Sequence, residues 1–407
     1  MARPPSILFV HDDFPGQFGG FAGWLAARGW DVAFATARAG AEAEGIRVLQ
    51  YAPHRRPSPE THPYAQPMDR AALNAQAFAR TALAARGAGL RPDFVMSHAG
   101  PGAGMFAKDV FPRARVVPYC EWWYRFPGAD VEFLAPIEPA AGPAGPEAAI
   151  HERARNAPIA LELSAADAGL VPTVFQAAQF PEALVARLTV LHDGIDTERF
   201  RPDPAARRGT LGGLVAPEAR VVTYATRGME PHRGFPQFMA ALPAVLAADP
   251  AVVAVIAGEN RVAYGGDAIR RIDWKARALA VHGLDPARVH FVGTLPFAGY
   301  RALLQRSDAH VYLTVPFVLS WSLLEAMAVG APLVASDTAP VREFADQGEA
   351  ALVDFREPAR LPEAILETLA GGPGVERRRR RARARIEADL AEPRIFAAKA
   401  QFLERLR

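Results

Sequence analysis

The stretch Ser320-Trp-Ser-Leu-Leu-Glu325-Ala-Met-Ala-Val-Gly330-Ala-Pro-Leu-Val-Ala-Ser336-Asp337 carries the pattern that decides the fold. It predicts a loop, a short helix over residues 321–329, a helix stop at Gly330 and a buried strand over residues 332–336. An apolar run at residues 309–314 comes before it and predicts another strand. A helix that joins two buried strands is typical of a parallel sheet covered by helices on both faces.

The same alternation of strands and helices occupies two regions of the chain. In the second region, the helical patterns lie at residues 236–248, 269–282 and 297–306, and the other strands are expected at residues 221–225, 252–257 and 289–292. The first region has a helical pattern at residues 21–28, and its expected strands lie at residues 6–10, 31–36, 94–97, 116–119, 170–173 and 189–192. Polar residues and prolines interrupt the pattern around residues 194–204. A chain of 407 residues has room for two domains, so we predict an α/β protein with two doubly wound, Rossmann-like domains, residues 1–195 and 196–392.

Composition and charge set broad limits on function. Half of the residues are apolar, 22% are charged and the net charge is +2, which is typical of a globular protein and gives no reason to expect nucleic acid as a partner. Cys120 is the single cysteine, and its apolar flanks predict a buried structural thiol in a reducing compartment. No apolar run has the length of a signal peptide or a membrane span. These features predict a soluble, cytoplasmic protein.

Three segments depart from the regular alternation. Residues 53–67 and 127–146 are rich in proline, and we expect both to be long loops within the first domain. Arginines at 377–381, 383 and 385 lie in a helical pattern. A solvated helix face is the favoured interpretation of this arginine run. The alternative is a contact with an anionic surface, such as the inner face of a membrane.

Several chemical motifs are absent from the sequence. It has no Walker phosphate loop, no Gly-x-Ser-x-Gly elbow, no Cys-x-x-Cys pair and no His-Glu-x-x-His zinc motif. It also has no Asp-x-Asp pair of the kind that holds a divalent ion in one major fold of sugar-transferring enzymes. If the reaction releases a phosphate leaving group, side chains and helix ends must therefore stabilise it, and we expect no metal or other cofactor.

The start of the helix in the quoted stretch predicts a site for a diphosphate. Its first amide groups have no partner within the helix and carry the positive end of the helix dipole. Glu325 lies one turn inside, where its carboxylate could accept hydrogen bonds from a ribose. The alternative is that Ser322-x-x-Glu325 is a capping box, which needs no ligand.

The longer context resembles the signature of retaining, nucleotide-sugar-dependent glycosyltransferases of family 4, also called glycosyl transferases group 1. The segment Val311-Tyr-Leu-Thr-Val-Pro-Phe317-Val-Leu-Ser-Trp-Ser resembles a bacterial branch of that family. The family motif is Glu-x7-Glu, and its second glutamate stands within the sequence Leu-Glu-Ala-x-Ala-x-Gly-x-Pro. It is matched here at Leu324, Glu325, Ala326, Ala328, Gly330 and Pro332. The resemblance implies the GT-B architecture, with two domains that face each other across a cleft and a C-terminal helix at residues 393–407 that returns to the first domain. It also implies that Ser320, Trp321, Ser322 and Leu324 lie at the donor site.

A second segment, Arg227-Gly-Met-Glu-Pro-His-Arg233-Gly234, follows an expected strand. Two guanidinium groups on one loop can clamp phosphate oxygens, although a salt-bridging surface loop has the same composition. The family has an arginine and then a Lys-Gly or Arg-Gly pair at this place, and both cations contact the donor diphosphate. Here the interval between the two is one residue longer than the commonest form. The resemblance implies this contact for Arg227 and Arg233.

Two residues of the first domain join the expected site through the resemblance. Gly16 lies in the loop after the first strand, where the family lets backbone amides approach the donor phosphate. His98 directly follows the strand expected at residues 94–97, at a place where the family has a histidine that reaches the donor sugar. The segment His192-Asp-Gly194-Ile-Asp196 is similar to the turn at the family's domain junction.

One position departs from the family pattern. The first glutamate of Glu-x7-Glu would fall eight residues before Glu325, and that residue is Phe317. In the family this glutamate contacts hydroxyl groups of the donor sugar. The replacement leaves the identity of the sugar open, and it motivates the alternative that the chain binds a nucleotide-sugar without turning it over.

Together these features predict a metal-independent retaining glycosyltransferase. Its donor is expected to be a UDP-sugar or GDP-sugar, and a glycan, a lipid-linked glycan and a small molecule all remain open as the acceptor. Arg227, Arg233 and the helix start near Ser322 would stabilise the departing diphosphate. Another GT-B activity, such as a sugar-nucleotide epimerase or a phosphorylase, is the alternative among enzymes.

Overall fold

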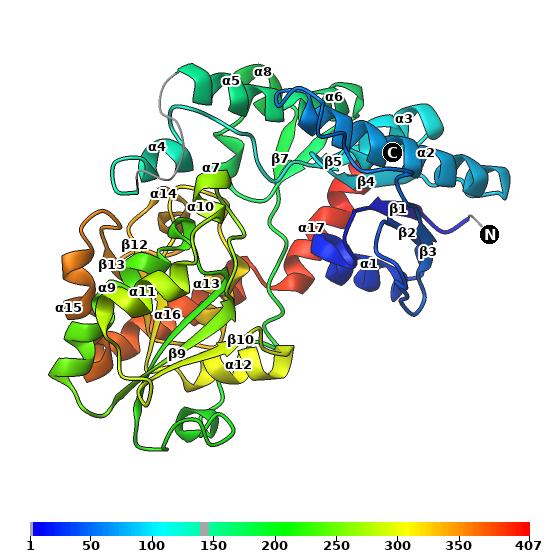
Figure 1. The fold of residues 1–407 in the computed structure, drawn as a ribbon. Coiled ribbons are helices and arrows are strands. Elements are labelled where there is room, and N and C mark those ends of the chain that lie inside the picture. The colour runs from blue at the N-terminus through cyan, green and yellow to red at the C-terminus, as the bar shows by residue number, and fades with distance from the viewer. Residues whose placement is uncertain (1–2, 139–145) are drawn as a thin grey trace. The chain divides into compact units, whose positions relative to one another are not determined.

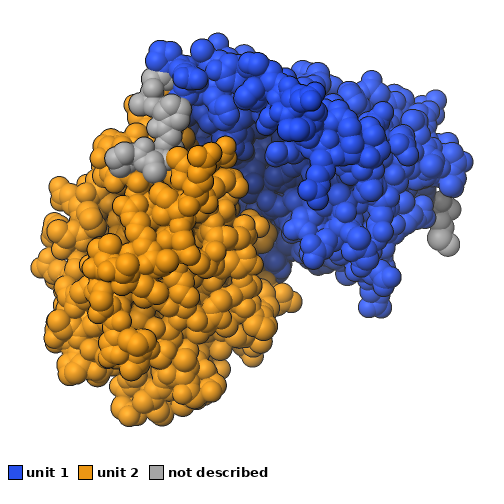
Figure 2. All heavy atoms as spheres, viewed as in Figure 1, with its two compact units in different colours: residues 1–125, 146–194, 392–407 blue, residues 126–145, 195–391 orange. Residues whose placement is uncertain are grey.

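The structure is a computed structural model that describes residues 3–138 and 146–407. It divides into two compact units (Figure 2). Unit 1 comprises Met1–Arg125, Pro146–Gly194 and Glu392–Arg407, and unit 2 comprises Phe126–Gly145 and Ile195–Ala391. Each unit is built on one parallel sheet with helices packed against it, so the predicted α/β class with two Rossmann-like units is confirmed (Figure 1).

The sheet of unit 1 has seven strands in the order β3-β2-β1-β4-β5-β6-β7. The strands are β1 (Ser6–Val10), β2 (Asp31–Thr36), β3 (Arg47–Gln50), β4 (Phe94–His98), β5 (Arg115–Tyr119), β6 (Gly169–Val171) and β7 (Leu188–Val190). All residues of β1 are buried, because a central strand of a parallel sheet has helices on both of its faces. The strand order reverses between β1 and β4, which makes their carboxyl ends the switch point of this sheet.

The helices of unit 1 include the last helix of the chain. They are α1 (Gly19–Ala26), α2 (Gln66–Gly87), α3 (Ala107–Val110), α5 (Pro146–Arg155), α6 (Ala157–Ala165), α7 (Val174–Ala177), α8 (Glu182–Val185) and α17 (Glu392–Arg405), with 3-10 turns η1 (Gly16–Phe18) and η2 (Ala103–Phe106). Helix α17 lies beside α1 (Figure 1), where Phe396 packs against Phe21 and Trp24. The final helix therefore belongs to the same compact unit as the N-terminal strands.

The sheet of unit 2 has six strands in the order β10-β9-β8-β11-β12-β13. The strands are β8 (Arg220–Gly228), β9 (Val252–Glu259), β10 (Val289–Gly293), β11 (Ala309–Tyr312), β12 (Leu333–Ser336) and β13 (Ala351–Val353). The order reverses between β8 and β11, so this sheet has its own switch point at the carboxyl ends of those two strands.

The helices of unit 2 follow the predicted alternation closely. They are α4 (Asp130–Leu134), α9 (Phe235–Ala248), α10 (Asp267–Arg270), α11 (Trp274–His282), α12 (Phe297–Arg306), α13 (Trp321–Ala328), α14 (Ala339–Arg342), α15 (Leu361–Ala370) and α16 (Pro373–Asp389), with 3-10 turns η4 (Ala206–Arg208), η5 (Pro231–Arg233) and η6 (Pro358–Arg360). The helix expected at residues 269–282 is broken into α10 and α11. The cause is Asp273, whose side chain accepts a hydrogen bond from the Ala276 amide at 2.9 Å and starts a new helix.

The segment expected as a long loop at residues 127–146 differs from that expectation. Helix α4 lies within it and clusters with unit 2 rather than with the first domain. Aromatic packing explains this placement, because the ring of Phe133 lies 5.6 Å from the ring of Phe355 and the guanidinium of Arg356 lies 4.0 Å from the Phe133 ring. Residues 139–145 of the segment lie outside the described residues.

The arginine run lies on α16, and most of its side chains form hydrogen bonds or ion pairs with other residues of the chain. Arg383 donates hydrogen bonds to the carbonyls of Thr197, Phe200 and Ala328, and Arg379 donates one to the carbonyl of Gly330. Arg381 and Arg385 are paired with Glu349, Arg380 lies 3.9 Å from Glu376, and Arg385 also bonds the Glu343 carbonyl. The prediction of a solvated face is therefore wrong for Arg379 and Arg383, which are mostly buried.

Among the described residues, no helix combines the length and the apolar character needed to cross a membrane.

Candidate functional site

The candidate site of unit 2 is a pocket at the switch point between β8 and β11. It is a small hollow that is partly open to solvent. Its lining comes from the ends of these two strands, from η5 and from the start of α13: Tyr224, Ala225, Thr226, Arg233, Val311, Tyr312, Leu313, Ser320 and Ser322. Ligands of open α/β sheets bind at this place, because the crossovers on either side run in opposite directions and leave room beyond the strands.

Arg233 is the cation of this pocket. It is 6% exposed, and its Nη1 donates a hydrogen bond to the hydroxyl of Thr314 at 2.7 Å. Its carbonyl accepts a hydrogen bond from Tyr224 at 2.6 Å, which holds η5 against the end of β8. Gly234 follows at φ +66°, and a Cβ there would lie 2.5 Å from that of Leu313, so only glycine fits. These contacts leave the guanidinium in a fixed position at the pocket wall.

The start of α13 faces the same pocket. Ser320 is the N-cap, and its hydroxyl accepts hydrogen bonds from the Ser322 amide at 3.3 Å and from the Ser322 hydroxyl at 3.0 Å. The Ser320 amide donates to the hydroxyl of Tyr312 at 2.9 Å. Because the cap is Ser320, Ser322 and Glu325 are out of register for a capping box, and the alternative that they form one is wrong.

Glu325 is held from a neighbouring helix. Tyr300 of α12 donates a hydrogen bond to Oε2 of Glu325 at 2.7 Å. Burial raises the pKa of Glu325 to about 7, although the hydrogen bond from Tyr300 acts in the opposite direction. A carboxyl group with this pKa exchanges its proton near neutral pH.

The other residues of this unit that were predicted for the donor site differ in burial and in their distance from the pocket. Phe317 is 8% exposed and packs its ring against His232 and Tyr264, and the Arg233 guanidinium lies 5.8 Å from that ring. Leu324 is fully buried in the core, whereas Trp321 is 40% exposed at the first turn of α13. Arg227 is exposed near the end of β8, and it is not among the residues that line the pocket.

In unit 1, Gly16 and His98 lie at the other switch point. Gly16 has φ +50°, and a Cβ there would lie 2.9 Å from the ring of His11, so the loop after β1 needs glycine to pass that ring. His98 ends β4, its ring centroid lies 4.7 Å from that of His11, and its Nε2 lies 3.4 Å from Oε2 of Glu121. Burial alone would lower the pKa of His98, but the hydrogen bond and negative charge of Glu121 raise it above its usual value.

Sequence reasoning did not identify five side chains that shape these two sites. They are Tyr300, Tyr312 and Thr314 in unit 2, and Gln17 and Glu121 in unit 1. Tyr312 and Thr314 belong to a predicted strand end, which is a signal that places them at the switch point. Tyr300, Gln17 and Glu121 depend on packing between elements distant in sequence, and no local pattern marks them.

Comparisons with known proteins identify both halves of the chain. Residues 28–200 match the family model described as "Glycosyl transferase family 4 group", and residues 219–371 match the model described as "Glycosyl transferases group 1". A curated relative is the glycogen synthase of Mycobacterium tuberculosis, 30% identical over 225 residues. This match covers 53% of the present chain and 48% of the relative, so the chain spans about half the length of the curated relatives it matches.

Solved structures extend the likeness in fold to the whole chain. The sucrose-phosphate synthase of Thermosynechococcus elongatus has a TM-score of 0.74 at 18% identity, and the match covers 99% of each chain. A glycosyltransferase of Rickettsia africae has a TM-score of 0.70 at 13% identity, with 100% of this chain and 99% of that one covered. Anabaena HepE in complex with UDP and glucose has a TM-score of 0.69 at 16% identity, with 98% and 99% covered. The predicted GT-B fold is thus confirmed, and the chain belongs to the family 4 glycosyltransferases, the glycosyl transferases group 1.

Proposed function

We propose that the chain transfers a sugar from a nucleotide-sugar to a hydroxyl group of an acceptor, with retention of configuration at the sugar carbon. The observation that carries the proposal is the convergence of the Arg233 guanidinium and the start of α13 on one pocket at the switch point of unit 2. A buried cation beside two serine hydroxyls and a helix start is complementary to a diphosphate.

The pocket's charge suits a leaving group that gains negative charge. As the bond between the sugar and the phosphate breaks, charge accumulates on the diphosphate oxygens. Arg233 would stabilise that charge from a fixed position, because Thr314 and Tyr224 already hold it, so little reorganisation is needed during the reaction. That Arg227 also stabilises the departing diphosphate remains a prediction.

Glu325 is proposed to bind the ribose of the nucleotide. Its carboxylate could accept hydrogen bonds from ribose hydroxyls while Tyr300 holds the other side of the group. HepE was solved with UDP, which supports UDP as the first nucleotide to test. The roles of Gly16 toward the donor phosphate and of His98 toward the donor sugar rest on the family resemblance.

Two other functions compete with transfer. A nucleotide-sugar-binding protein without turnover is motivated by Phe317, which places an apolar ring where the family has a glutamate. Another GT-B activity, such as epimerisation of a sugar-nucleotide, would use the same donor pocket. Release of free nucleotide that depends on an acceptor distinguishes transfer from both.

The experiment is a calorimetric titration of the full chain with UDP, GDP and ADP, without added metal. Wild type is compared with Arg233→Ala and Glu325→Gln. We expect one nucleotide to bind clearly and both variants to bind it more weakly. Acceptor-dependent nucleotide release is then measured with sugars attached to that nucleotide. If none of the three nucleotides binds, even with added magnesium, the proposal fails.

A further inference from the structure

Three aromatic rings lie beside Arg233 at the carboxyl edge of the unit 2 sheet. Tyr264 follows β9, His232 lies in η5 and Phe317 follows β11. The centroid of the Phe317 ring lies 5.1 Å from that of Tyr264 and 6.0 Å from that of His232, in the edge-to-face arrangement that aromatic pairs favour. We refer to Tyr264, His232 and Phe317 as the aromatic wall.

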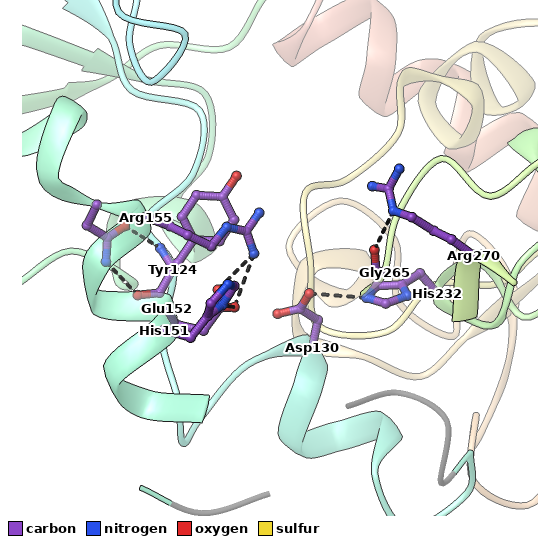
Figure 3. Close-up of polar contacts among 9 residues, drawn as sticks. Tyr124, Asp130, His151, Glu152, Arg155, His232, Gly265 and Arg270 are labelled. Atoms are coloured by element: carbon purple, nitrogen blue, oxygen red, sulfur yellow. Dashed lines mark hydrogen bonds and ion pairs between the residues drawn. The ribbon is translucent and has the colours of Figure 1, made fainter. Parts of the chain in front are cut away.

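Polar contacts hold the aromatic wall from behind. Nε2 of His232 lies 3.2 Å from Oδ2 of Asp130 on α4 (Figure 3). The fully buried carboxyl group of Glu230 accepts a hydrogen bond from the Ala263 amide at 2.6 Å and another from the Tyr264 amide. Because buried polar groups fix both η5 and the loop after β9, the wall is a preformed surface.

The aromatic wall reaches the cation of the donor pocket. The guanidinium carbon of Arg233 lies 5.0 Å from the centroid of the Tyr264 ring and 5.8 Å from that of the Phe317 ring. Arg233 itself lines the pocket in which we propose that the diphosphate binds. In a nucleotide-sugar, one phosphate carries the ribose and the other carries the sugar. A sugar on the phosphate held by Arg233 therefore lies within reach of the wall.

The aromatic wall is apolar toward a ligand. The Phe317 ring carries no polar atom, and Nδ1 of His232 is buried with no hydrogen-bond partner in the described part of the chain. The Tyr264 hydroxyl accepts a hydrogen bond from the Arg233 side chain. A sugar hydroxyl placed on the Phe317 ring would lose its hydrogen bonds to water without replacement, whereas a methyl group there gains from leaving water.

We propose that Phe317 determines the choice of donor sugar, and that this sugar is a 6-deoxyhexose, which has a methyl group in place of the CH2OH group of a hexose. The exocyclic carbon is the substituent of a hexose that can present a whole methyl group to the face of a phenyl ring. A hexose that keeps its 6-hydroxyl leaves that group unpaired at the wall and is the poorer donor. This inference rests on the proposed function, because it places a nucleotide-sugar in the unit 2 pocket.

The test compares donors that differ in one hydroxyl group. Isothermal titration of the full chain measures UDP-glucose against UDP-6-deoxyglucose, or the matching GDP-mannose or ADP-glucose pair if GDP or ADP is the nucleotide that binds. We expect the wild-type chain to bind the 6-deoxy donor about tenfold more tightly, the effect of one buried hydroxyl without a partner. Phe317→Gln supplies an amide at the wall and should reduce this preference to about twofold or less. Free nucleotide should bind every variant within about twofold.

Further variants separate apolar character from packing. Phe317→Ala removes the ring and should also lower the preference, so the test holds even if Phe317→Gln folds poorly. Phe317→Leu stays apolar and should keep most of the preference. Phe291→Leu, a half-buried ring on β10, is the control and should change nothing.

The outcomes separate this inference from the proposed function. Equal binding of the two donors by a wild-type chain that binds free nucleotide overturns the inference alone. So does a preference that both Phe317→Gln and Phe317→Ala retain, or one that Phe317→Leu loses as fully as Phe317→Gln. Failure of every nucleotide to bind overturns the proposed function, and the inference with it.

Discussion

Tyr300 donates a hydrogen bond to Glu325 across 2.7 Å, from helix α12 to helix α13. This contact joins the two helices that precede and follow strand β11 in the sequence. It holds the Glu325 carboxyl group that we propose to bind ribose. Burial raises the pKa of that group to about 7, and the bond from Tyr300 limits the rise. The affinity for the nucleotide should therefore depend on whether the Glu325 carboxyl group is protonated.

The first prediction concerns pH. The carboxylate form of Glu325 is a stronger hydrogen-bond acceptor for ribose hydroxyls than the neutral acid, and a group with its pKa at about 7 is mostly protonated below that value. UDP affinity should thus fall about tenfold between about pH 8 and about pH 6. Tyr300→Phe removes an interaction that lowers the pKa, so the midpoint of this fall should move to higher pH. Calorimetric titrations across that range measure both effects.

Glu325→Gln is the control for this pH dependence. Because the terminal phosphate of UDP titrates at about pH 6, the informative quantity is the ratio of wild-type to variant affinity at each pH. The glutamine cannot ionise, so this ratio should grow with pH. A ratio that stays constant would mean that Glu325 does not contact the nucleotide.

The second prediction concerns Arg233. Arg233→Ala should weaken UDP binding ~100-fold, because a charge-assisted contact with the diphosphate is lost from a buried position. Uridine, which lacks the diphosphate, should bind both proteins within about twofold. Arg220→Ala, at the opposite end of β8 and 51% exposed, is the matched control and should leave both ligands unaffected. Equal losses for UDP and uridine would indicate a structural role for Arg233.

The sequence was sufficient to predict unit 2 in some detail. The predicted helix at residues 297–306 is α12, and the strand expected at residues 252–257 lies within β9. These elements are apolar enough for local patterns to mark them, and Gly330 marks the end of α13, where it adopts φ +68°. The family motif also led to Arg233 and Ser322, which line one pocket.

Long-range packing limited what the sequence could predict. Helix α4 packs on Phe355, which is more than two hundred residues away in sequence, and nothing in its own proline-rich segment indicates that partner. Glu121 and Gln17 likewise meet only because β1 and β5 belong to one sheet. Contacts of this kind follow from topology, and local propensity carries no information about them.

The third prediction concerns Asp130 on α4. Its Oδ2 lies 3.2 Å from Nε2 of His232, which is 3% exposed and immediately precedes Arg233 in η5 (Figure 3). Asp130→Ala removes a hydrogen bond that holds η5, so UDP should bind about fivefold more weakly while uridine is less affected. Glu132→Gln, on the same helix, keeps a side-chain oxygen that can accept the hydrogen bond from the Gly128 amide, so it should have no effect. If Asp130→Ala binds UDP as tightly as wild type, α4 does not position Arg233.

The last helix is tied to unit 1 by a buried ion pair. Lys399 of α17 and Asp193 are 2% and 6% exposed in their side chains, and their charged atoms lie 3.3 Å apart. Asp193 also accepts a hydrogen bond from the buried hydroxyl of Tyr119 at 2.8 Å. Loss of one charge from such a pair leaves the other buried without compensation, which costs more than the pair contributes relative to apolar groups.

The fourth prediction follows from this asymmetry. Lys399→Met should lower the free energy of unfolding of unit 1 by about 3–5 kcal/mol, because the carboxylate of Asp193 then stays buried without its counter-charge. Adding Asp193→Asn should restore much of that loss, since the new amide is neutral and its carbonyl oxygen can still accept the hydrogen bond from Tyr119. Urea unfolding of the full chain measures these changes. Arg405→Met, exposed on the same helix, is the control. A double variant as unstable as Lys399→Met alone would show that the lysine stabilises α17 by packing rather than by its charge.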